Sequence, residues 1–151
     1  MDKDHYIHQF DLGPQELKLR LLDCGRKGGE ETLELKQSGL NVVPVDAERD
    51  LPKLSFQDEA FDMALCGGFL FAANEKLSDS FHIQALIELA RVATEVRVVP
   101  LVNEQGQPSK HLGPVLQELQ EKGFGVEVRQ VKNQNNGHPL LRVWNETCKV
   151  K

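Results

Sequence analysis

Short apolar blocks alternate along the chain with longer segments that mix polar and apolar residues. Apolar runs bounded by turn residues are typical of buried strands, and they predict strands over residues 19–22, 41–45, 61–66, 96–102, 125–131 and 140–144. Apolar residues at helical spacing, together with terminal signals, predict helices over 14–19, 29–38, 79–92 and 110–122. This alternation predicts an α/β fold with a mostly parallel sheet and helices on both faces.

Residues that begin and end helices support these boundaries. Pro14 suits the first position of a short leading helix, and Gly39 and Gly123 suit the ends of two later ones. Ser78 or Asp79 can cap the helix that runs to about residue 92. The closing strands are joined by the polar segment KNQNNGHP, so we expect a hairpin-like ending with an antiparallel last strand.

The composition is that of one ordinary globular domain spanning residues 1–151, with 40% hydrophobic and 27% charged residues. Its formal net charge of -5 disfavours a nucleic-acid partner, because an acidic surface gains no affinity from counterion release. No window approaches the length of a membrane span, so a membrane partner is not expected either.

The cysteines and histidines exclude two kinds of site. Three widely spaced cysteines without a CxxC pair suit a reducing compartment, so we expect a cytoplasmic protein. The five histidines are scattered without metal-ligand spacing, so no metal site is predicted.

Three segments carry a resemblance to a known family: FDLGPQELKLRLLDCG, LSFQDEAFDMALCGGFLF and FHIQALIELARVATEVRVVPLVNEQGQPSKHLGPVLQELQEKGFGVEVRQV. The chain resembles class I S-adenosylmethionine-dependent methyltransferases, and more narrowly a bacterial group of small, mostly uncharacterised methyltransferase-like proteins. The resemblance implies a Rossmann-like fold with S-adenosylmethionine (SAM) as the cofactor.

The resemblance also implies which residues bind the cofactor. In the family a first strand ends in Asp-x-Gly-x-Gly-x-Gly; here Lys27 stands at the middle glycine. An acid after the second strand takes the ribose hydroxyls, and a later strand end lines the cleft beside the methyl group. The implied cofactor-binding residues are Asp23, Gly25, Gly29, Asp46, Cys66 and Gly67.

The interval after Asp46 is shorter than the family pattern. Asp46 and Phe61 are only 15 positions apart, and one parallel crossover alone needs about a dozen residues. We therefore expect one edge strand of the sheet to be lost. An alternative register makes the Asp46-Ala47-Glu48 segment or Asp50 the acid on the adenine side of the site, so that two motifs merge into one.

Each candidate residue also has a simpler structural interpretation. The glycines after Asp23 suit any tight turn between strand and helix, Asp46 could be a solvated cap, and Cys66 could be a small buried apolar residue. His82 and Glu75 are the available candidates for a general base, although a packed histidine is the commoner case.

Two classes of function follow from these observations. The first is a SAM-dependent methyltransferase with a small-molecule acceptor, and the alternative is a catalytically inactive methyltransferase-like fold that binds a protein partner. A nicotinamide-dependent dehydrogenase fits less well, because the chain lacks the G-x-G-x-x-G spacing.

Overall fold

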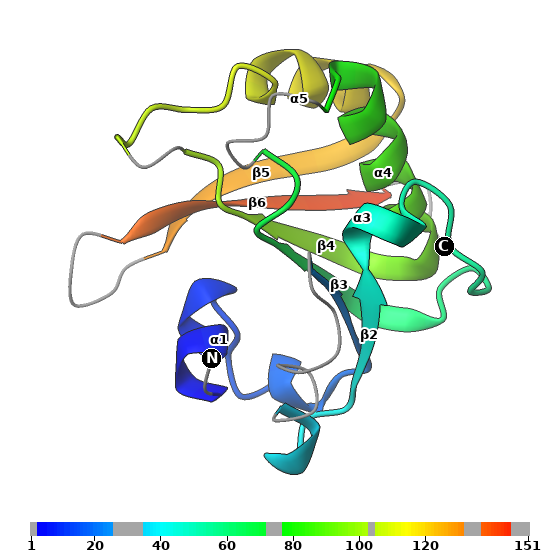
Figure 1. Cartoon of the computed structure of the whole chain (residues 1–151), viewed down its shortest axis with the longest axis vertical. Coiled ribbons are helices and arrows are strands. Elements are labelled where there is room, and N and C mark those ends of the chain that lie inside the picture. Colours follow the sequence, from blue (N-terminus) through cyan, green and yellow to red (C-terminus); the bar gives the residue numbers. More distant parts are fainter. Residues whose placement is uncertain (1–2, 26–34, 72–76, 103–104, 132–136, 146–151) are drawn as a thin grey trace.

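The computed structural model describes residues 3–25, 35–71, 77–102, 105–131 and 137–145 (Figure 1). Its elements, in chain order, are α1 (Lys3–Gln9), the 3-10 turn η1 (Glu16–Lys18), β1 (Leu21–Gly25), β2 (Val42–Asp46), α3 (Ala47–Asp50), β3 (Phe61–Gly67), α4 (Asp79–Val92), β4 (Ala93–Val99), α5 (Leu112–Glu121), β5 (Phe124–Val131) and β6 (His138–Asn145). Residues 35–37 are also helical.

The strands form one six-stranded sheet in the order β2-β1-β3-β4-β6-β5. β2, β1, β3 and β4 are parallel neighbours, and β6 runs antiparallel to both β4 and β5. The predicted Rossmann-like α/β fold with an antiparallel last strand is therefore confirmed.

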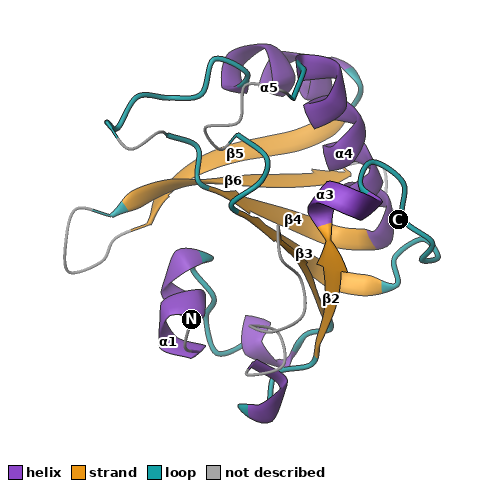
Figure 2. Cartoon of the chain, in the orientation of Figure 1, coloured by secondary structure: helices purple, strands orange, loops and turns teal. Residues whose placement is uncertain are grey.

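Helices cover both faces of this sheet (Figure 2). One apolar core lies between the sheet and the helices α4 and α5, with the fully buried Leu86 and Leu119 at its centre. The second core lies under α1 and residues 35–40, where Tyr6, Phe10 and Leu35 pack on the opposite face. Successive strand residues point to opposite faces, so each central strand contributes to both cores.

The helix ends follow the sequence signals. The Ser78 side chain accepts a hydrogen bond from the Phe81 amide at 3.0 Å and begins α4. Gly39 and Gly123 have φ of +97° and +92°, the left-handed conformation that favours glycine at a helix C-terminus. Because these signals are local, they were readable from the sequence.

The sheet lacks the expected edge strand beyond β2. Residues 47–60 are all described and form α3 followed by turns, with no strand among them. The predicted loss of one edge strand is thus confirmed, and β2 is an edge of the sheet.

Several elements differ from the prediction. The short helix α3 was not predicted, and the predicted helix over 14–19 is only the three-residue 3-10 turn η1. Of the predicted helix over 29–38, residues 29–34 lie outside the described residues. The N-terminal helix α1 was not predicted, because its seven residues are mostly polar and carry no strong cap. The fourth strand begins at Ala93, directly after α4, and ends before a cis peptide bond at Pro100.

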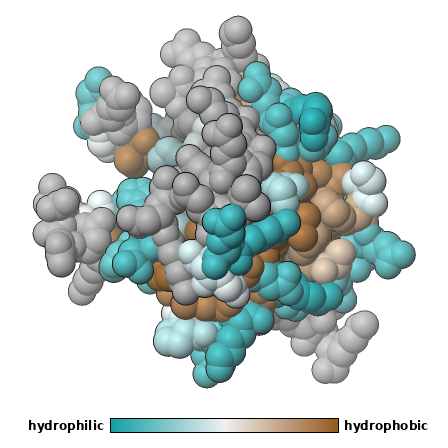
Figure 3. All heavy atoms as spheres, turned by 60° about the horizontal axis from the view of Figure 1, so that its bottom comes forward, coloured by the Kyte–Doolittle hydropathy of each residue, from teal (hydrophilic) through white to brown (hydrophobic). Residues whose placement is uncertain are grey.

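In Figure 3 polar residues make up much of the described surface, with apolar residues visible between them. No helix within the described ranges is long and apolar enough to cross a bilayer.

Candidate functional site

The carboxyl ends of three parallel strands align in one row. Gly25, the last residue of β1, is in register with Asp46 of β2 on one side and with Gly67 of β3 on the other. In open α/β sheets, ligands bind in the crevice outside the carboxyl ends of the strands. The sheet therefore brings three of the six residues implied by the resemblance to one place.

Among the described residues, few atoms approach Gly25. A Cβ atom added to this glycine would meet only the Asp23 Oδ1 atom of that part of the chain, at 4.0 Å. Asp23 itself points to the face covered by α1, where its Oδ1 accepts a hydrogen bond from the Tyr6 hydroxyl at 3.2 Å. Asp23 therefore ties α1 to the end of β1.

Asp46 caps the short helix that follows it. Its Oδ1 atom accepts a hydrogen bond from the Glu48 amide at 3.1 Å. Asp50, the alternative acid, forms an ion pair with Arg49 at 3.0 Å, and this contact lowers the pKa of the Asp50 carboxyl. Asp46 stands in the row of strand ends, whereas Asp50 lies at the end of α3.

Gly67 is covered by the N-terminal segment. A Cβ atom at Gly67 would lie 3.2 Å from Phe10 Cζ and 3.5 Å from Gln9 Nε2, so a side chain here would require Phe10 to shift by a few tenths of an ångström. The Phe10 ring is itself 1% exposed. The surface of β3 beside Gly25 is thus occupied by the protein's own chain.

Cys66 points into the other core. It is fully buried beside Cys24, its neighbour across the two strands. A hydrogen bond with Cys66 and burial raise the pKa of the Cys24 thiol well above its usual value. Both cysteines pack there as small apolar residues, so only the Cys66 backbone can face a ligand at the strand ends.

His82 is 1% exposed and lies in the core. Its Nε2 atom accepts a hydrogen bond from the Phe71 amide at 3.0 Å, so Nδ1 carries the proton and donates it to the Ser78 carbonyl at 2.7 Å. Burial lowers the pKa of His82, and the nearby His111 acts in the same direction. His82 is therefore placed to hold the turn at Phe71, which has a φ of +60°.

Three residues singled out in the sequence lie outside the described residues: Lys27, Gly29 and Glu75. No group of histidine, cysteine or carboxylate side chains in the described part of the chain could hold a metal ion.

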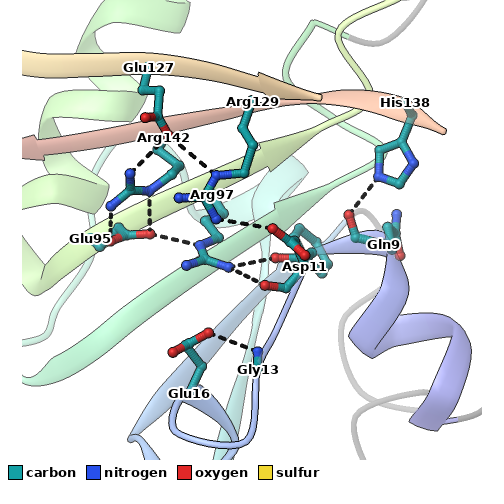
Figure 4. A network of polar contacts seen from close by, with 11 residues as sticks. Gln9, Asp11, Gly13, Glu16, Glu95, Arg97, Glu127, Arg129, His138 and Arg142 are labelled. Carbon is teal, nitrogen blue, oxygen red and sulfur yellow. Dashed lines mark hydrogen bonds and ion pairs between the residues drawn. The ribbon is translucent and has the colours of Figure 1, made fainter. Parts of the chain in front are cut away.

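A buried ionic network fixes the chain that covers Gly67 (Figure 4). The guanidinium of Arg97 on β4, 5% exposed, donates to the backbone carbonyls of Phe10 and Asp11 at 2.8 and 2.7 Å. Glu95 accepts from Arg97 at 2.7 Å and from Arg142 of β6 at 3.0 and 2.9 Å. This network was not predicted, because Arg142 and the Phe10 and Asp11 carbonyls lie far along the chain from the neighbouring Glu95 and Arg97.

A cavity of about 320 Å³ adjoins the covered glycine. It lies between α1, Gly68, the segment 99–102 and the start of β6. Three histidines contribute to its wall: His5, His8 and His138. These histidines are widely spaced in the sequence. His5 and His8 lie on α1, which was not predicted, and His138 lies at the start of β6.

Comparison with known proteins supports the fold. No family model matches the chain. An uncharacterised protein of Methanocaldococcus jannaschii is 34% identical over 90 residues, which cover 60% of this chain and 39% of that protein. The chain thus spans about two fifths of the length of this curated relative.

Solved structures give a similarity over nearly the whole chain. A SAM-dependent methyltransferase from Aquifex aeolicus matches with a TM-score of 0.53 and 18% identity, over 95% of this chain and 94% of that one. One from Methanosarcina mazei has a TM-score of 0.51 and 17% identity, over 95% and 97%. Magnesium protoporphyrin IX methyltransferase from Synechocystis, solved with bound SAM, has a TM-score of 0.51 and 15% identity, over 94% and 77%. This chain has the class I SAM-dependent methyltransferase fold.

Proposed function

We propose that the chain binds SAM at the carboxyl ends of β1 and β2 and is a methyltransferase for a small-molecule acceptor. The observation that supports this most is the row formed by Gly25 and Asp46, in which no described residue except Asp23 lies within 4 Å of a Cβ position on the glycine. Its neighbours of the same fold include SAM-dependent enzymes, one of them solved with SAM bound.

The chemistry of the two residues suits the cofactor. Gly25 has no side chain, so a ligand can approach the backbone there. A carboxylate offers about four lone-pair sites, so Asp46 can accept from the Glu48 amide and still accept from two vicinal ribose hydroxyls. Gly29 is assigned to cofactor binding on the resemblance alone, while Asp23 holds the end of β1 through its hydrogen bond from Tyr6.

The residues described have modest chemical tasks in this proposal. SAM, when bound, supplies an already electrophilic methyl group. The chain's own contribution is to orient the reactants and to exclude water, and Phe10 and Gln9, which cover Gly67 beside the row, shield that side of it. An N–H or O–H acceptor must lose its proton as the methyl group is transferred, and His82 is not placed to take it, because both of its ring nitrogens are already hydrogen-bonded in the core. Glu75 lies outside the described residues.

The acidic net charge favours a small molecule over a nucleic acid as the acceptor. We also infer a cytoplasmic location, because Cys24 and Cys66 are neighbouring free thiols.

A second candidate is an inactive fold that binds a protein partner. Two observations favour it: Phe10 packs 3.2 Å from the position of a Cβ on Gly67, and the sheet lacks the strand that would flank an adenine slot. The first feature reduces the room for a cofactor on the β3 side of Gly25, and the second removes a wall of the site on the β2 side.

Thermal unfolding with and without millimolar SAM or S-adenosylhomocysteine separates the two candidates. A ligand present at a hundred times its Kd adds about 2.7 kcal/mol to the free energy of unfolding, a clear rise in Tm for a chain of this size. A rise with either ligand supports the methyltransferase. The absence of any rise would favour the inactive fold.

Asp46→Asn tests the proposed ribose contact. Asparagine is as good an N-cap as aspartate, so the variant should keep its stability without ligand. It should bind S-adenosylhomocysteine about 10- to 100-fold more weakly in calorimetry, because hydrogen bonds to a charged group contribute about 1.5–3 kcal/mol. Glu121→Gln, an exposed change on α5, is the matched control and should bind normally. Equal binding by Asp46→Asn would remove Asp46 from the site.

A further inference from the structure

The described sheet has two edge strands, β2 and β5, and one of them is closed to further pairing. An edge strand presents unpaired N–H and C=O groups to which another chain can bond. The Leu21 amide donates to the Asn41 carbonyl at 2.8 Å, which fixes the direction of the other amides in this parallel ladder. In the register of β1 and β2, the nitrogen of Pro44 then faces the open edge. Proline has no N–H, so β2 cannot complete a ladder with a further strand.

β5, at the other end of the sheet, keeps all of its backbone donors. Its eight residues contain no proline, and in the described part of the protein they pair only with β6. Val128 lies in the middle of the strand and is 47% exposed. It is the only large hydrophobic side chain that is exposed on the described surface. β5 is therefore the edge at which a further strand can be added.

Opposite charges flank Val128 on the other face of the strand: Glu127 and Arg129 (Figure 4). Glu127 accepts at Oε1 from Arg142 at 2.9 Å, and Arg129 Nε lies 3.4 Å from the same atom. Arg129 donates from Nη1 to Asp11 at 3.0 Å. Within the described part of the protein, Glu127 Oε2 and Arg129 Nη2 make no hydrogen bond. The Glu127 and Arg129 side chains are 45% and 36% exposed, so a second molecule can reach both.

The order of these three residues makes β5 complementary to its own copy. Antiparallel pairing about a two-fold axis at Val128 places Val128 opposite Val128 of the second copy. The same pairing places Glu127 of each copy opposite Arg129 of the other, so the charge pair forms twice. Residues directly opposite each other have Cβ atoms about 4.5–5.5 Å apart, within reach of a charge pair. An axis at Glu127 or at Arg129 would instead place two like charges opposite each other, so the charges select the register.

We propose that β5 pairs with β5 of a second copy of this chain, antiparallel and about a two-fold axis at Val128, so that one continuous sheet runs through a homodimer. The main-chain hydrogen bonds of the added strand supply affinity, and the charge pairs fix the register. β3, β4 and β6 lie between β5 and the row of Gly25 and Asp46, so the dimer leaves the proposed cofactor site open. The inference does not depend on the proposed function.

Sedimentation equilibrium of the full chain tests the proposal. Over about 1 μM to 1 mM, a range in which small polar interfaces associate, the average mass should rise from that of one chain to that of two. Sedimentation velocity should show no species larger than the dimer, because two-fold pairing covers the β5 edge and Pro44 blocks the β2 edge. A single chain at every concentration, or growth to longer oligomers, would overturn the proposal.

A pair of charge reversals tests the register. Glu127→Arg places two positive charges opposite each other, and Arg129→Glu places two carboxylates opposite each other. Each variant alone should dimerise at least about tenfold more weakly, because both symmetric pairs change from attractive to repulsive. An equal mixture of the two variants should regain wild-type association as a heterodimer, since every charge at these positions then faces its opposite. Native mass spectrometry identifies the heterodimer by its mass.

Two further variants complete the test. Lys53→Glu, an exposed charge reversal in the segment after α3, is the matched control and should associate like the wild type. Val128→Lys places two like charges at the axis and should weaken association, which keeps the test valid if either charge reversal on β5 does not fold. Unchanged association in Val128→Lys, or no recovery on mixing the two charge variants, would overturn the proposal. These measurements contain no SAM, so their failure is distinct from that of the proposed function.

Discussion

At the scale of single residues, Glu95 is the centre of the buried ionic network. Its carboxylate lies between two guanidinium groups, those of Arg97 and Arg142. Burial acts to raise the pKa of Glu95, but the hydrogen bonds from both arginines outweigh it and lower the pKa to about 2. A buried charge is tolerated only when it is paired in this way. Through Arg97 the same carboxylate also fixes the carbonyls of Phe10 and Asp11.

Glu95→Gln should therefore destabilise the protein by about 3–5 kcal/mol at pH 7, because two arginines lose a charged partner inside the fold. The folded-state pKa is below the ordinary value of 4.5, so the stability from this group is complete above about pH 5 and is lost as the pH falls towards 2. The difference between variant and wild type should shrink over that window. Urea unfolding at pH 7, 5 and 3 measures it.

Glu127→Gln is the control for this experiment. Glu127 accepts from Arg142 at 2.9 Å, but its side chain is 45% exposed. An exposed pair contributes about 0.2–1 kcal/mol, so this variant should be close to wild type. Similar losses in the two variants would show that burial of Glu95 is not what matters.

At the scale of elements, the first turn of α4 links the turn after β3 to α5. Asp79 bonds to His111, whose ring stacks on His82 with centroids 4.6 Å apart, and His82 accepts from the Phe71 amide. The Ser78 carbonyl accepts a hydrogen bond from His82 Nδ1, and the Ser78 hydroxyl caps the helix. The sequence predicted this helix and its cap but not the role of His82, because the partner amide belongs to another segment.

Mild acid should weaken this link. Burial keeps the His82 pKa below the ordinary 6.5, so the unfolded chain takes up a proton first and stability falls as the pH drops below about 6.5. His111 and Asp79, which face the ring, act on the pKa in opposite directions. We expect a lower urea midpoint at pH 5.5 than at 7.5 in the wild type.

His82→Gln should show a smaller pH dependence over the same interval, since glutamine does not titrate. His8→Gln, on the exposed side of α1, should keep the wild-type dependence. An unchanged pH dependence in His82→Gln would assign the effect to another group.

At the scale of the whole molecule, the strands and their antiparallel ending were predictable, because apolar periodicity and caps are local properties of the sequence. The lost edge strand was predictable only from the resemblance, because the interval after Asp46 is shorter than the family pattern. The cavity and the ionic network were not. Arg97 bonds to Phe10 across 87 positions, and His138 bonds to Gln9 across 129. Such contacts exist only once the sheet has assembled, and both depend on α1, which carries little sequence signal of its own.

The two cores share one sheet, so the fold should unfold as a unit even when a single layer is weakened. Phe10 is 1% exposed and packs against the end of β3. β3 is a central strand, whereas β5 is the edge strand on the other side of β4 and β6. Phe10→Ala should lower the free energy of unfolding by about 3–5 kcal/mol. Trp144, the single tryptophan, lies on β6 and reports on the far part of the sheet.

We expect tryptophan fluorescence and far-UV circular dichroism to give the same urea midpoint in the wild type and the same lower midpoint in Phe10→Ala. Coincident transitions follow if the α1 layer and the β5–β6 pair cannot unfold separately, because Arg97 and Arg142 join them through Glu95. Val128→Ala, a change at a 47% exposed residue of β5, should leave both midpoints nearly unchanged. If Phe10→Ala lowered only the dichroism midpoint, α1 would be a separately folding cover whose opening admits ligands to the strand ends.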